Sequence, residues 1–447
     1  MHKKKFRKIT ASAIAVLILS LTITIFIFAR AYSSLSEEII TSPLSPSQAT
    51  ALQTVLNKTY PDRSPSYIAP LPYKVKEAEL EISAKSAILF DATTGSVLYK
   101  KNSSEKIPPA SLTKIVEMFV VLDQVERGNI SLDDIVPLPP ESWAENLPLD
   151  ASRMGLTEDS HVTLRDLLTG LAVVSGNDAS IAVANYVCGN MEDFVKKMNE
   201  TVLQAGLSQT QFVESSGYSE KNITTAKEFA SFARLYINTF PYALDEFHAK
   251  KHLGKMENTN KLLWTLDGCD GLKTGYIEES GYNICVTAKR RGNRFVSVTL
   301  GGPGNSTKEG NEGRVKDNTL LLEFAFNNFA DYKANHHYQV KVLGAKEDSF
   351  FAIPATSESL TVPFTKGNSV ADSVKEVRAI ARLPNRMKGS VQVGEKIGTI
   401  SYILGDITLN EIPLVADRNI EEGNFLQRTW GSIQSILLPQ KVKTIED

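Results

Sequence analysis

The chain is poor in the residues that most often carry enzymatic chemistry. Its 447 residues include only 3 cysteines and 6 histidines. Cys188, Cys269 and Cys285 lack the spacing of a zinc site and are too few for a disulfide framework, so we expect buried thiols and at most one bridge. No histidine lies in a glycine-rich elbow, which argues against a Ser-His-Asp triad.

A metal-binding pattern is also lacking. His248 and His252 are spaced so that they can share one face of a helix, but alanine follows His248 where a zinc peptidase has glutamate. We therefore interpret both as ordinary surface histidines. The sequence predicts no metal site and no cofactor.

An excess of positive charge is absent as well. The chain has 49 basic and 51 acidic residues, for a net charge of −2, and six of the basic residues lie within residues 1–31, where there is no acid. The rest of the chain is thus acidic, which argues against nucleic acid as a partner. With 42% apolar and 22% charged residues, the composition is that of an ordinary globular protein of two or three domains.

The N-terminal segment predicts export. Met1–Lys8 is basic, and Ile9–Ala29 is a run of apolar, serine and threonine residues long enough to span a bilayer core of about 30 Å. Ala29-Arg-Ala31 nevertheless matches an A-x-A cleavage site. Residues 1–31 are therefore either a signal peptide or a membrane anchor, and both alternatives place the remainder outside the cytoplasm.

Residues 32–85 contain six prolines among many serines, so we predict a poorly ordered linker, within which Ala49–Leu56 can form a short helix. Alternation around Gly95 then predicts a β-hairpin over residues 87–100. The helical periods that follow lie at 115–125, 163–174, 178–187 and 225–237, and strand periods lie at 272–276, 282–288 and 294–300. With a last helix at 317–329, this order predicts an α+β domain with an antiparallel sheet over residues 86–334.

The hydrophobic pattern of the sequence changes after residue 335. Short alternating runs at 338–343, 360–364, 374–383, 391–393 and 399–404 are separated by glycine, proline and asparagine. They predict a small all-β sandwich domain over residues 335–420. In residues 421–447, Leu426, Trp430, Ile433 and Leu437 have helical spacing, and basic residues follow. They predict an amphipathic helix and a tail.

Three short motifs carry the candidate chemistry. Ser111-Leu-Thr-Lys114 places a hydroxyl and an amine on one face at the start of an apolar helix, where a desolvated lysine can act as a base. A second S-x-x-K, Ser103–Lys106, lies in a polar loop that would not desolvate its lysine, and we reject it. Ser175-Gly-Asn177 separates two apolar helices, and Lys273-Thr-Gly275 lies on a predicted strand.

Taken alone, the second motif is consistent with a simple turn between helices and the third with an exposed edge lysine. Together and in this order they are the motifs of penicillin-binding proteins and serine β-lactamases. The surrounding sequence resembles that of the low-molecular-mass penicillin-binding proteins, the D-alanyl-D-alanine carboxypeptidases, over about residues 87–438. The resemblance rests on Asp91–Gly95, Pro108–Lys114, Asn258–Leu263, Asp270–Tyr276 and Glu422–Phe425.

The resemblance implies a β-lactamase/transpeptidase-like catalytic domain and an enzyme that removes the terminal D-alanine from peptidoglycan stem pentapeptides. Ser111 would form the acyl-enzyme, Lys114 would be its base and Ser175 would relay a proton. The implied substrate-binding residues are Asn177, Lys273, Thr274, Gly275 and Tyr276. The N–H groups of Ser111 and Tyr276 would form the oxyanion hole.

The resemblance also implies the protein's surroundings. β-Lactam antibiotics would acylate the same serine, and the C-terminal helix would bind the membrane surface. The enzyme would work at the extracytoplasmic face of the bacterial inner membrane, on the periplasm side.

Three alternatives remain open from the sequence. A β-lactamase would share the fold, and Glu214 is the candidate for activating its deacylating water; the appended β domain argues against this alternative. A D,D-endopeptidase would use the same residues. An inactive peptidoglycan-binding protein is opposed by the intact Ser111, Lys114 and Lys273. Ile277–Glu279 and Glu214–Gly217 depart from the family pattern and bear on specificity.

Overall fold

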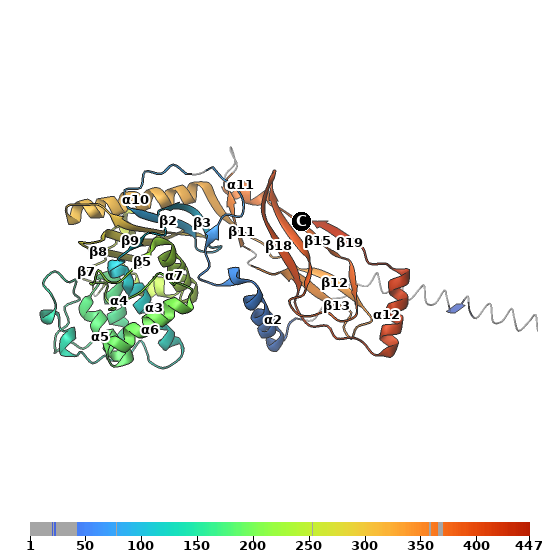
Figure 1. The fold of residues 1–447 in the computed structure, drawn as a ribbon, viewed down its shortest axis with the longest axis horizontal. Helices are drawn as coiled ribbons and strands as arrows, with labels where there is room; N and C mark the ends of the chain where they lie inside the picture. Colours follow the sequence, from blue (N-terminus) through green and yellow to red (C-terminus); the bar gives the residue numbers. More distant parts are fainter. Residues whose placement is uncertain are drawn as a thin grey trace, which may run out of the picture.

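The computed structural model describes residues 20, 22–23, 43–76, 78–252, 254–356, 359–364 and 370–447. The predicted signal peptide or anchor, residues 1–31, lies almost entirely outside these residues. Within the described part of the chain, no helix has the length and apolarity needed to cross a membrane. Figure 1 shows a mixed helix-and-sheet body beside a body built almost wholly of strands, with helix α12 at the far end of the second.

One six-stranded sheet organises the mixed body, and its strand order is β1-β3-β2-β10-β9-β8. The strands are β1 (Ala69–Pro70), β2 (Ser86–Asp91), β3 (Ser96–Lys101), β8 (Cys269–Ile277), β9 (Gly281–Arg290) and β10 (Asn293–Gly302). The predicted hairpin is confirmed as β2 and β3, with Gly95 at a φ of +79° in its turn. Every neighbouring pair is antiparallel except β1 and β3. The β2–β10 pairing joins the two ends of this domain's sequence.

Helices cover both faces of this sheet. Side chains alternate along β2, so that Ile88 faces the helical cluster and Leu89 faces α10 (Thr307–Asn328). The helical cluster comprises α3 (Thr113–Glu126), α4 (Leu164–Val173), α5 (Asn177–Cys188), α6 (Met191–Gln204), α7 (Ala226–Thr239) and α8 (Ala243–Phe247). The short helix α9 (Leu262–Thr265) instead buries Leu262 on the face that α10 covers. The α+β class is thus confirmed. Helix α10 begins well before the predicted residue 317, because Ser306 caps it by accepting a hydrogen bond from the Glu309 N–H.

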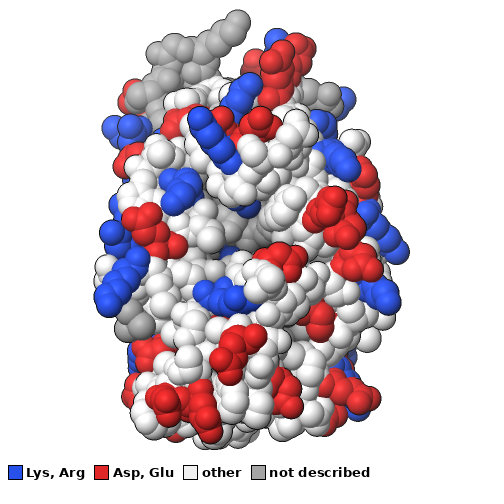
Figure 2. Space-filling model, turned by 90° about the vertical axis from the view of Figure 1, so that its left-hand side faces the viewer, with Lys and Arg blue, Asp and Glu red and all other residues white. Residues whose placement is uncertain are grey.

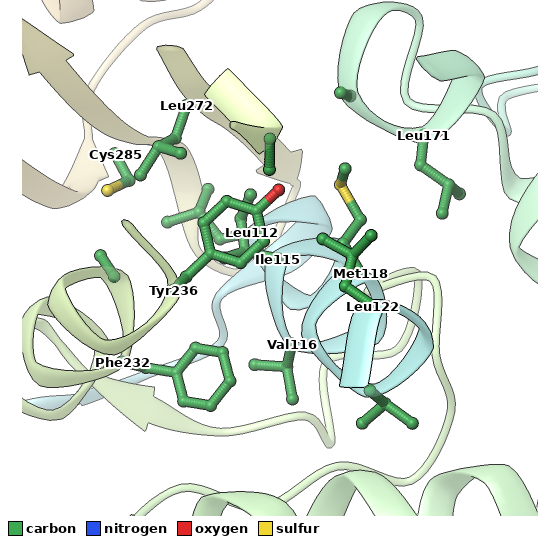
Figure 3. Close-up of a cluster of buried hydrophobic side chains, with 14 of the residues drawn as sticks. Leu112, Ile115, Val116, Met118, Leu122, Leu171, Phe232, Tyr236, Leu272 and Cys285 are labelled. Atoms are coloured by element: carbon green, nitrogen blue, oxygen red, sulfur yellow. The ribbon is translucent and has the colours of Figure 1, made fainter. Parts of the chain in front are cut away.

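Helix α3 runs through the centre of the helical cluster. Figure 3 shows its side chains Val116, Met118 and Leu122 pointing in different directions into the surrounding apolar residues. Leu272 and Cys285, from β8 and β9, close the same cluster from the side of the sheet. Helix α3 is therefore anchored in the core, which positions any group on its first turn.

The second body is a small all-β domain, as expected. Its seven-stranded sheet has the order β16-β12-β13-β18-β17-β15-β19. The strands are β12 (Tyr338–Leu343), β13 (Ser349–Pro354), β15 (Arg378–Pro384), β16 (Arg386–Lys388), β17 (Lys396–Leu404), β18 (Ile407–Ala416) and β19 (Val442–Glu446). β11 (Phe329–Lys333) and β14 (Ser359–Pro363) pair separately, and α11 (Val370–Lys375) precedes β15. The run at 391–393 forms only an isolated bridge, from Val391 to Ile420.

The prediction of a poorly ordered spacer over residues 32–85 is wrong for its described part. Residues 46–59 form α2 (Pro46–Thr59), which contains the expected short helix, and its Leu52 and Leu56 pack on Ala355 and Val415 of the β domain. Further along, the Arg234 guanidinium of α7 donates to the carbonyl oxygens of residues 64, 65 and 67. The prolines led to this wrong prediction because one of them, Pro46, occupies the first turn of α2, where proline is favoured.

The C-terminal tail also differs from the expectation. Helix α12 (Phe425–Leu437) forms where it was predicted, with a capping box between Asn424 and Gln427. Beyond it, β19 pairs antiparallel with β15, so the tail is an edge strand of the β domain. Helix α12 is therefore held at both ends by the same sheet.

Two expectations about single residues need correction. His248 and His252 were predicted to lie on the surface, but both are buried. The His248 ring contacts the Tyr236 hydroxyl at 3.1 Å and the Leu272 carbonyl oxygen at 3.0 Å. The three cysteines are free thiols, of which only Cys285 is fully buried.

Candidate active site

Ser111 lies in a tight turn immediately before α3. The short helix η2 (Ala110–Leu112) carries it, and Ala110 has a φ of +51°. Two neighbouring segments can approach this turn closely because each has a glycine at the point of contact. A Cβ at Gly275 of β8 would lie 2.8 Å from the Pro109 carbonyl oxygen and 3.0 Å from the Ser111 nitrogen, and one at Gly217 would overlap the Ala110 carbonyl. The sheet edge and the loop at 214–217 thus hold Ser111 from opposite sides.

Lys114 lies on the first turn of α3 and is completely buried. Its Nζ donates to Asn177 Oδ1 at 2.8 Å and to the Ser216 carbonyl oxygen at 2.5 Å, and it lies 3.3 Å from Ser111 Oγ. The two oxygens can only accept hydrogen bonds. A neutral amine would give them its two N–H groups and keep its lone pair for the Ser111 hydroxyl. By contrast, Lys106 of the rejected motif is exposed.

Ser175 and Asn177 lie between α4 and α5, on the other side of Lys114. Ser175 has a φ of +62°, in the left-handed region that serine rarely adopts. Its Oγ is buried and has no hydrogen-bond partner among the described residues. Asp178, next to Asn177, accepts backbone N–H bonds from residues 154, 155 and 156 and so fastens the start of α5.

The third motif lines the site from strand β8. Lys273 is buried although β8 is an edge strand of the sheet, which rules out the alternative of an exposed edge lysine. Its Nζ donates to the Thr274 carbonyl oxygen at 3.0 Å, and Thr274 Oγ1 lies 2.6 Å from Thr259 Oγ1. Tyr276 is half exposed and stacks on Tyr282, with ring centroids 4.4 Å apart. The structure therefore brings the three motifs together around Ser111.

Burial dominates the electrostatics of the two lysines. It lowers the pKa of Lys114, and the acidic groups Glu117, Glu214 and Asp178 partly oppose this effect. The pKa of Lys273 is lowered well below its usual value, first by burial and then by the charges of Lys114 and Arg314. The change at Lys114 favours the amine form, which is the form that a general base requires.

Sequence reasoning missed three groups at this site. Arg314 of α10 reaches behind β8 and donates to the carbonyl oxygens of Gly275 and Asn283, each at 3.3 Å. Ser216 contacts Lys114 through its backbone carbonyl oxygen, a group that every residue has and that no sequence motif marks. Glu117 is fully buried one turn beyond Lys114. A charged residue inside an apolar helix is a signal in the sequence from which the position of Glu117 could have been predicted.

Glu214 does not face the serine as a free base. Its carboxylate accepts hydrogen bonds from the Ser216 hydroxyl at 2.6 Å, the Ser216 and Gly217 N–H groups at 2.7 and 2.8 Å, and Asn222 Nδ2 at 2.8 Å. A fifth, longer bond comes from the Ser219 N–H. Glu214 thus shapes the loop that places the Ser216 carbonyl on Lys114, and the β-lactamase alternative loses its candidate base.

Within the described ranges, no three histidine, cysteine, aspartate or glutamate side chains converge to hold a metal ion. Figure 2 shows the end of the molecule formed by the mixed domain. Lysine and arginine are interspersed there with aspartate and glutamate, and a hollow lies near the middle of this face.

Comparison with known proteins agrees with this arrangement. Residues 73–304 match the family model described as D-alanyl-D-alanine carboxypeptidase, and residues 326–422 match that of the C-terminal domain of penicillin-binding protein 5. The D-alanyl-D-alanine carboxypeptidase DacF of Bacillus subtilis is 32% identical over 373 residues, which cover 80% of this chain and 91% of the relative.

Solved structures show the same likeness. Penicillin-binding protein 5 of Haemophilus influenzae aligns with a TM-score of 0.68 and 29% identity, over 77% of this chain and 99% of that one. Penicillin-binding protein D2 of Listeria monocytogenes, solved in its cefotaxime-bound form, aligns with a TM-score of 0.50 and 30% identity, over 55% of this chain and 98% of that one. The chain therefore belongs to the D-alanyl-D-alanine carboxypeptidase family and is a low-molecular-mass penicillin-binding protein.

Proposed function

We propose that this chain is a serine D,D-carboxypeptidase that removes the terminal D-alanine from peptidoglycan stem pentapeptides, with Ser111 as its nucleophile. One observation carries the assignment of roles: the buried amine of Lys114 faces Ser111 Oγ while two carbonyl oxygens occupy its N–H groups. This arrangement aims the lone pair of a neutral amine at the serine hydroxyl.

Acylation follows from this geometry. Lys114 takes the proton of Ser111 as Oγ bonds to the carbonyl carbon between the two D-alanines. The N–H groups of Ser111 and Tyr276 would stabilise the oxyanion. The C–N bond then breaks, and the leaving amine receives a proton through Ser175, whose hydroxyl has no partner in the described part of the protein and is free to bond to substrate. Water hydrolyses the ester and releases the shortened peptide.

The same geometry supports a role in substrate binding for Asn177 and strand β8. Asn177 bonds to Lys114 through Oδ1, which leaves its amide N–H groups for a substrate carbonyl. Lys273 and Thr274 would bind the terminal carboxylate, and Gly275 leaves the space that an extended peptide beside β8 requires. A carboxylate there would restore an ionic partner to the buried Lys273.

Helix α12 is the candidate contact with the extracytoplasmic face of the inner membrane. It packs on the β domain through Gly431 and Gln434, which are buried. Phe425, Leu426 and Ile436 point away from the domain and are 72%, 75% and 80% exposed. An amphipathic helix that rests its polar and small residues on its own domain and leaves its apolar residues outside fits a membrane surface.

We also propose the division of the chain given by its sequence. It assigns residues 1–31 to export, residues 86–334 to catalysis and residues 335–420 to the β domain. Residues 421–447 are the helix of the membrane contact and a tail, whose strand β19 also completes the sheet of the β domain. The packing of α2 on the β domain supports a role for residues 43–85 as an ordered connecting segment that contacts both domains.

Mass spectrometry of the protein after incubation with penicillin tests the assignment. We expect one adduct, on Ser111, and release of D-alanine from a pentapeptide that ends in D-Ala-D-Ala. Ser111→Ala should abolish both, whereas the matched variant Ser103→Ala, in the rejected motif, should retain both. An adduct on Ser103 would overturn the assignment, and a wild-type protein that never forms an adduct would support the inactive binding protein.

A further inference from the structure

Glu117 is a buried acidic residue for which the mechanism above has no use. It lies three residues after Lys114 on α3, so both side chains leave the same face of the helix. Its exposed fraction is zero, although the helix around it is apolar. An isolated buried carboxylate is costly, so its charge must be compensated or lost.

The hydrogen bonds around Glu117 compensate it only in part. Oε2 accepts from Ser180 Oγ at 2.9 Å, and Ser180 Oγ lies 2.6 Å from Ser215 Oγ. Oε1 has no partner among the residues that the structure describes. The chain of contacts leads from Glu117 to Ser215, the neighbour of the residue whose carbonyl oxygen accepts from Lys114.

The other charged groups near Lys114 differ from Glu117. Asp178 of α5 accepts four backbone N–H bonds, and the carboxylate oxygens of Glu214 accept hydrogen bonds from N–H groups of its own loop. Lys273 of β8, with Arg314 of α10 behind it, adds positive charge. Among these carboxylates, Glu117 alone lacks backbone donors, and the charge of Lys114 is the electrostatic influence that favours its ionised form.

We propose that Glu117 is a positioning residue that acts through Lys114: its carboxylate holds a proton on the buried amine and thereby sets the lower pH limit of Ser111 acylation. This inference rests on the proposed roles of Ser111 and Lys114. The pair is neutral overall in both arrangements of its proton, as ammonium with carboxylate or as amine with carboxylic acid. Acylation requires the amine, so the charge of Glu117 opposes catalysis at low pH and assists burial of the lysine.

The direction of the effect follows from electrostatics. A negative charge beside an ammonium group raises the pKa of that group, and Glu117 acts on Lys114 in this sense. Burial raises the pKa of Glu117 itself, whereas the charge of Lys114 lowers it and so favours the ionised carboxylate next to an ammonium group. Wherever Glu117 is ionised, removing its charge increases the fraction of free amine on Lys114.

The test is the pH dependence of the second-order rate constant for acylation by benzylpenicillin, measured on the full-length protein. In Glu117→Gln, which keeps an acceptor for Ser180, the acidic limb of the pH–rate profile should move to lower pH by about 1 pH unit. At a pH on that limb, the rate constant, expressed as a fraction of its plateau value, would be about tenfold higher than in the wild type. Glu117→Asp keeps the charge and should retain the wild-type limb. Glu126→Gln removes a charge about 18 Å along the helix axis from Lys114 and should leave the limb unchanged.

The outcomes separate the inference from the proposed function. A Glu117→Gln profile that is lower at every pH but has the wild-type shape, or a limb that moves to higher pH, would overturn the inference, because either result assigns Glu117 a structural role alone. Should Glu117→Gln not fold, Glu117→Thr, which also removes the charge, carries the same expectation. A wild-type protein that is not acylated at any pH would instead refute the proposed function.

Discussion

The exposed apolar face of α12 gives a quantitative prediction about membrane binding. The change is the double substitution Leu426→Ser and Ile436→Ser in a chain that begins at Pro43, so that residues 1–42 do not contribute. The start at Pro43 keeps α2, whose Leu52 and Leu56 pack on the β domain. Removing residues 422–447 would be a poor alternative, because β19 pairs with β15.

The magnitude follows from the exposed fractions. Leu426 and Ile436 are 75% and 80% exposed, and full burial of such a side chain contributes about 1.5–3 kcal/mol. Complete insertion of both would thus contribute about 2–4.5 kcal/mol. A helix lying in the interface inserts only partly, so about half of this, roughly 1–2 kcal/mol, is expected. The double substitution should therefore weaken binding to anionic liposomes by roughly 5–30-fold.

Flotation with liposomes over a range of lipid concentrations measures this change. Leu149→Ser is the matched control, because Leu149 is 96% exposed but lies in the catalytic domain, far from α12. Hydrolysis of a soluble pentapeptide should be equal in all three proteins, since the three motifs lie in the other domain. If the double variant floated like the parent, or if Leu149→Ser lost as much binding, the assignment of α12 to the membrane would be refuted.

Three further predictions concern the catalytic domain and its junction with the β domain. Lys114→Arg should acylate at least 100-fold more slowly than the wild type at neutral pH, because a guanidinium keeps its proton there; penicillin labelling at the wild-type rate would remove Lys114 from the mechanism. Gly217→Ala should lose at least about 1–2 kcal/mol of stability from its φ of +80° alone, which urea unfolding measures. It should also slow acylation, measured by penicillin labelling, because the new Cβ overlaps the Ala110 carbonyl beside Ser111. Burial and the neighbouring Asp91 raise the pKa of Asp331 to about 9, above its value in the unfolded chain. The melting temperature should therefore fall as the pH rises from 5 to 9, and Asp331→Asn should make this fall less steep. An unchanged slope in Asp331→Asn would show that Asp331 does not cause the pH dependence.

Local patterns predicted most of the secondary structure and failed where one pattern has two meanings. The hairpin around Gly95 and the helix that starts after Ser111 came directly from alternation and helical spacing. Proline indicates both linkers and first helical turns, and the sequence around Pro46 was assigned to the first. The buried position of His248 depends on β8 and α7 packing around it, which no local pattern encodes.

The relation between Ser111 and Lys114 was determined by the sequence alone, because a spacing of three residues on a helix brings two side chains together in any surrounding. Their partners were decided by tertiary structure. Asn177, the Ser216 carbonyl and Lys273 reach the site from different elements, and only the packing of α5, the 214–217 loop and β8 around α3 turns a surface-type lysine into a desolvated amine. Glu117 shows the same division: its charge is visible in the sequence, but its position beside Lys114 with one uncompensated oxygen exists only once the core has closed.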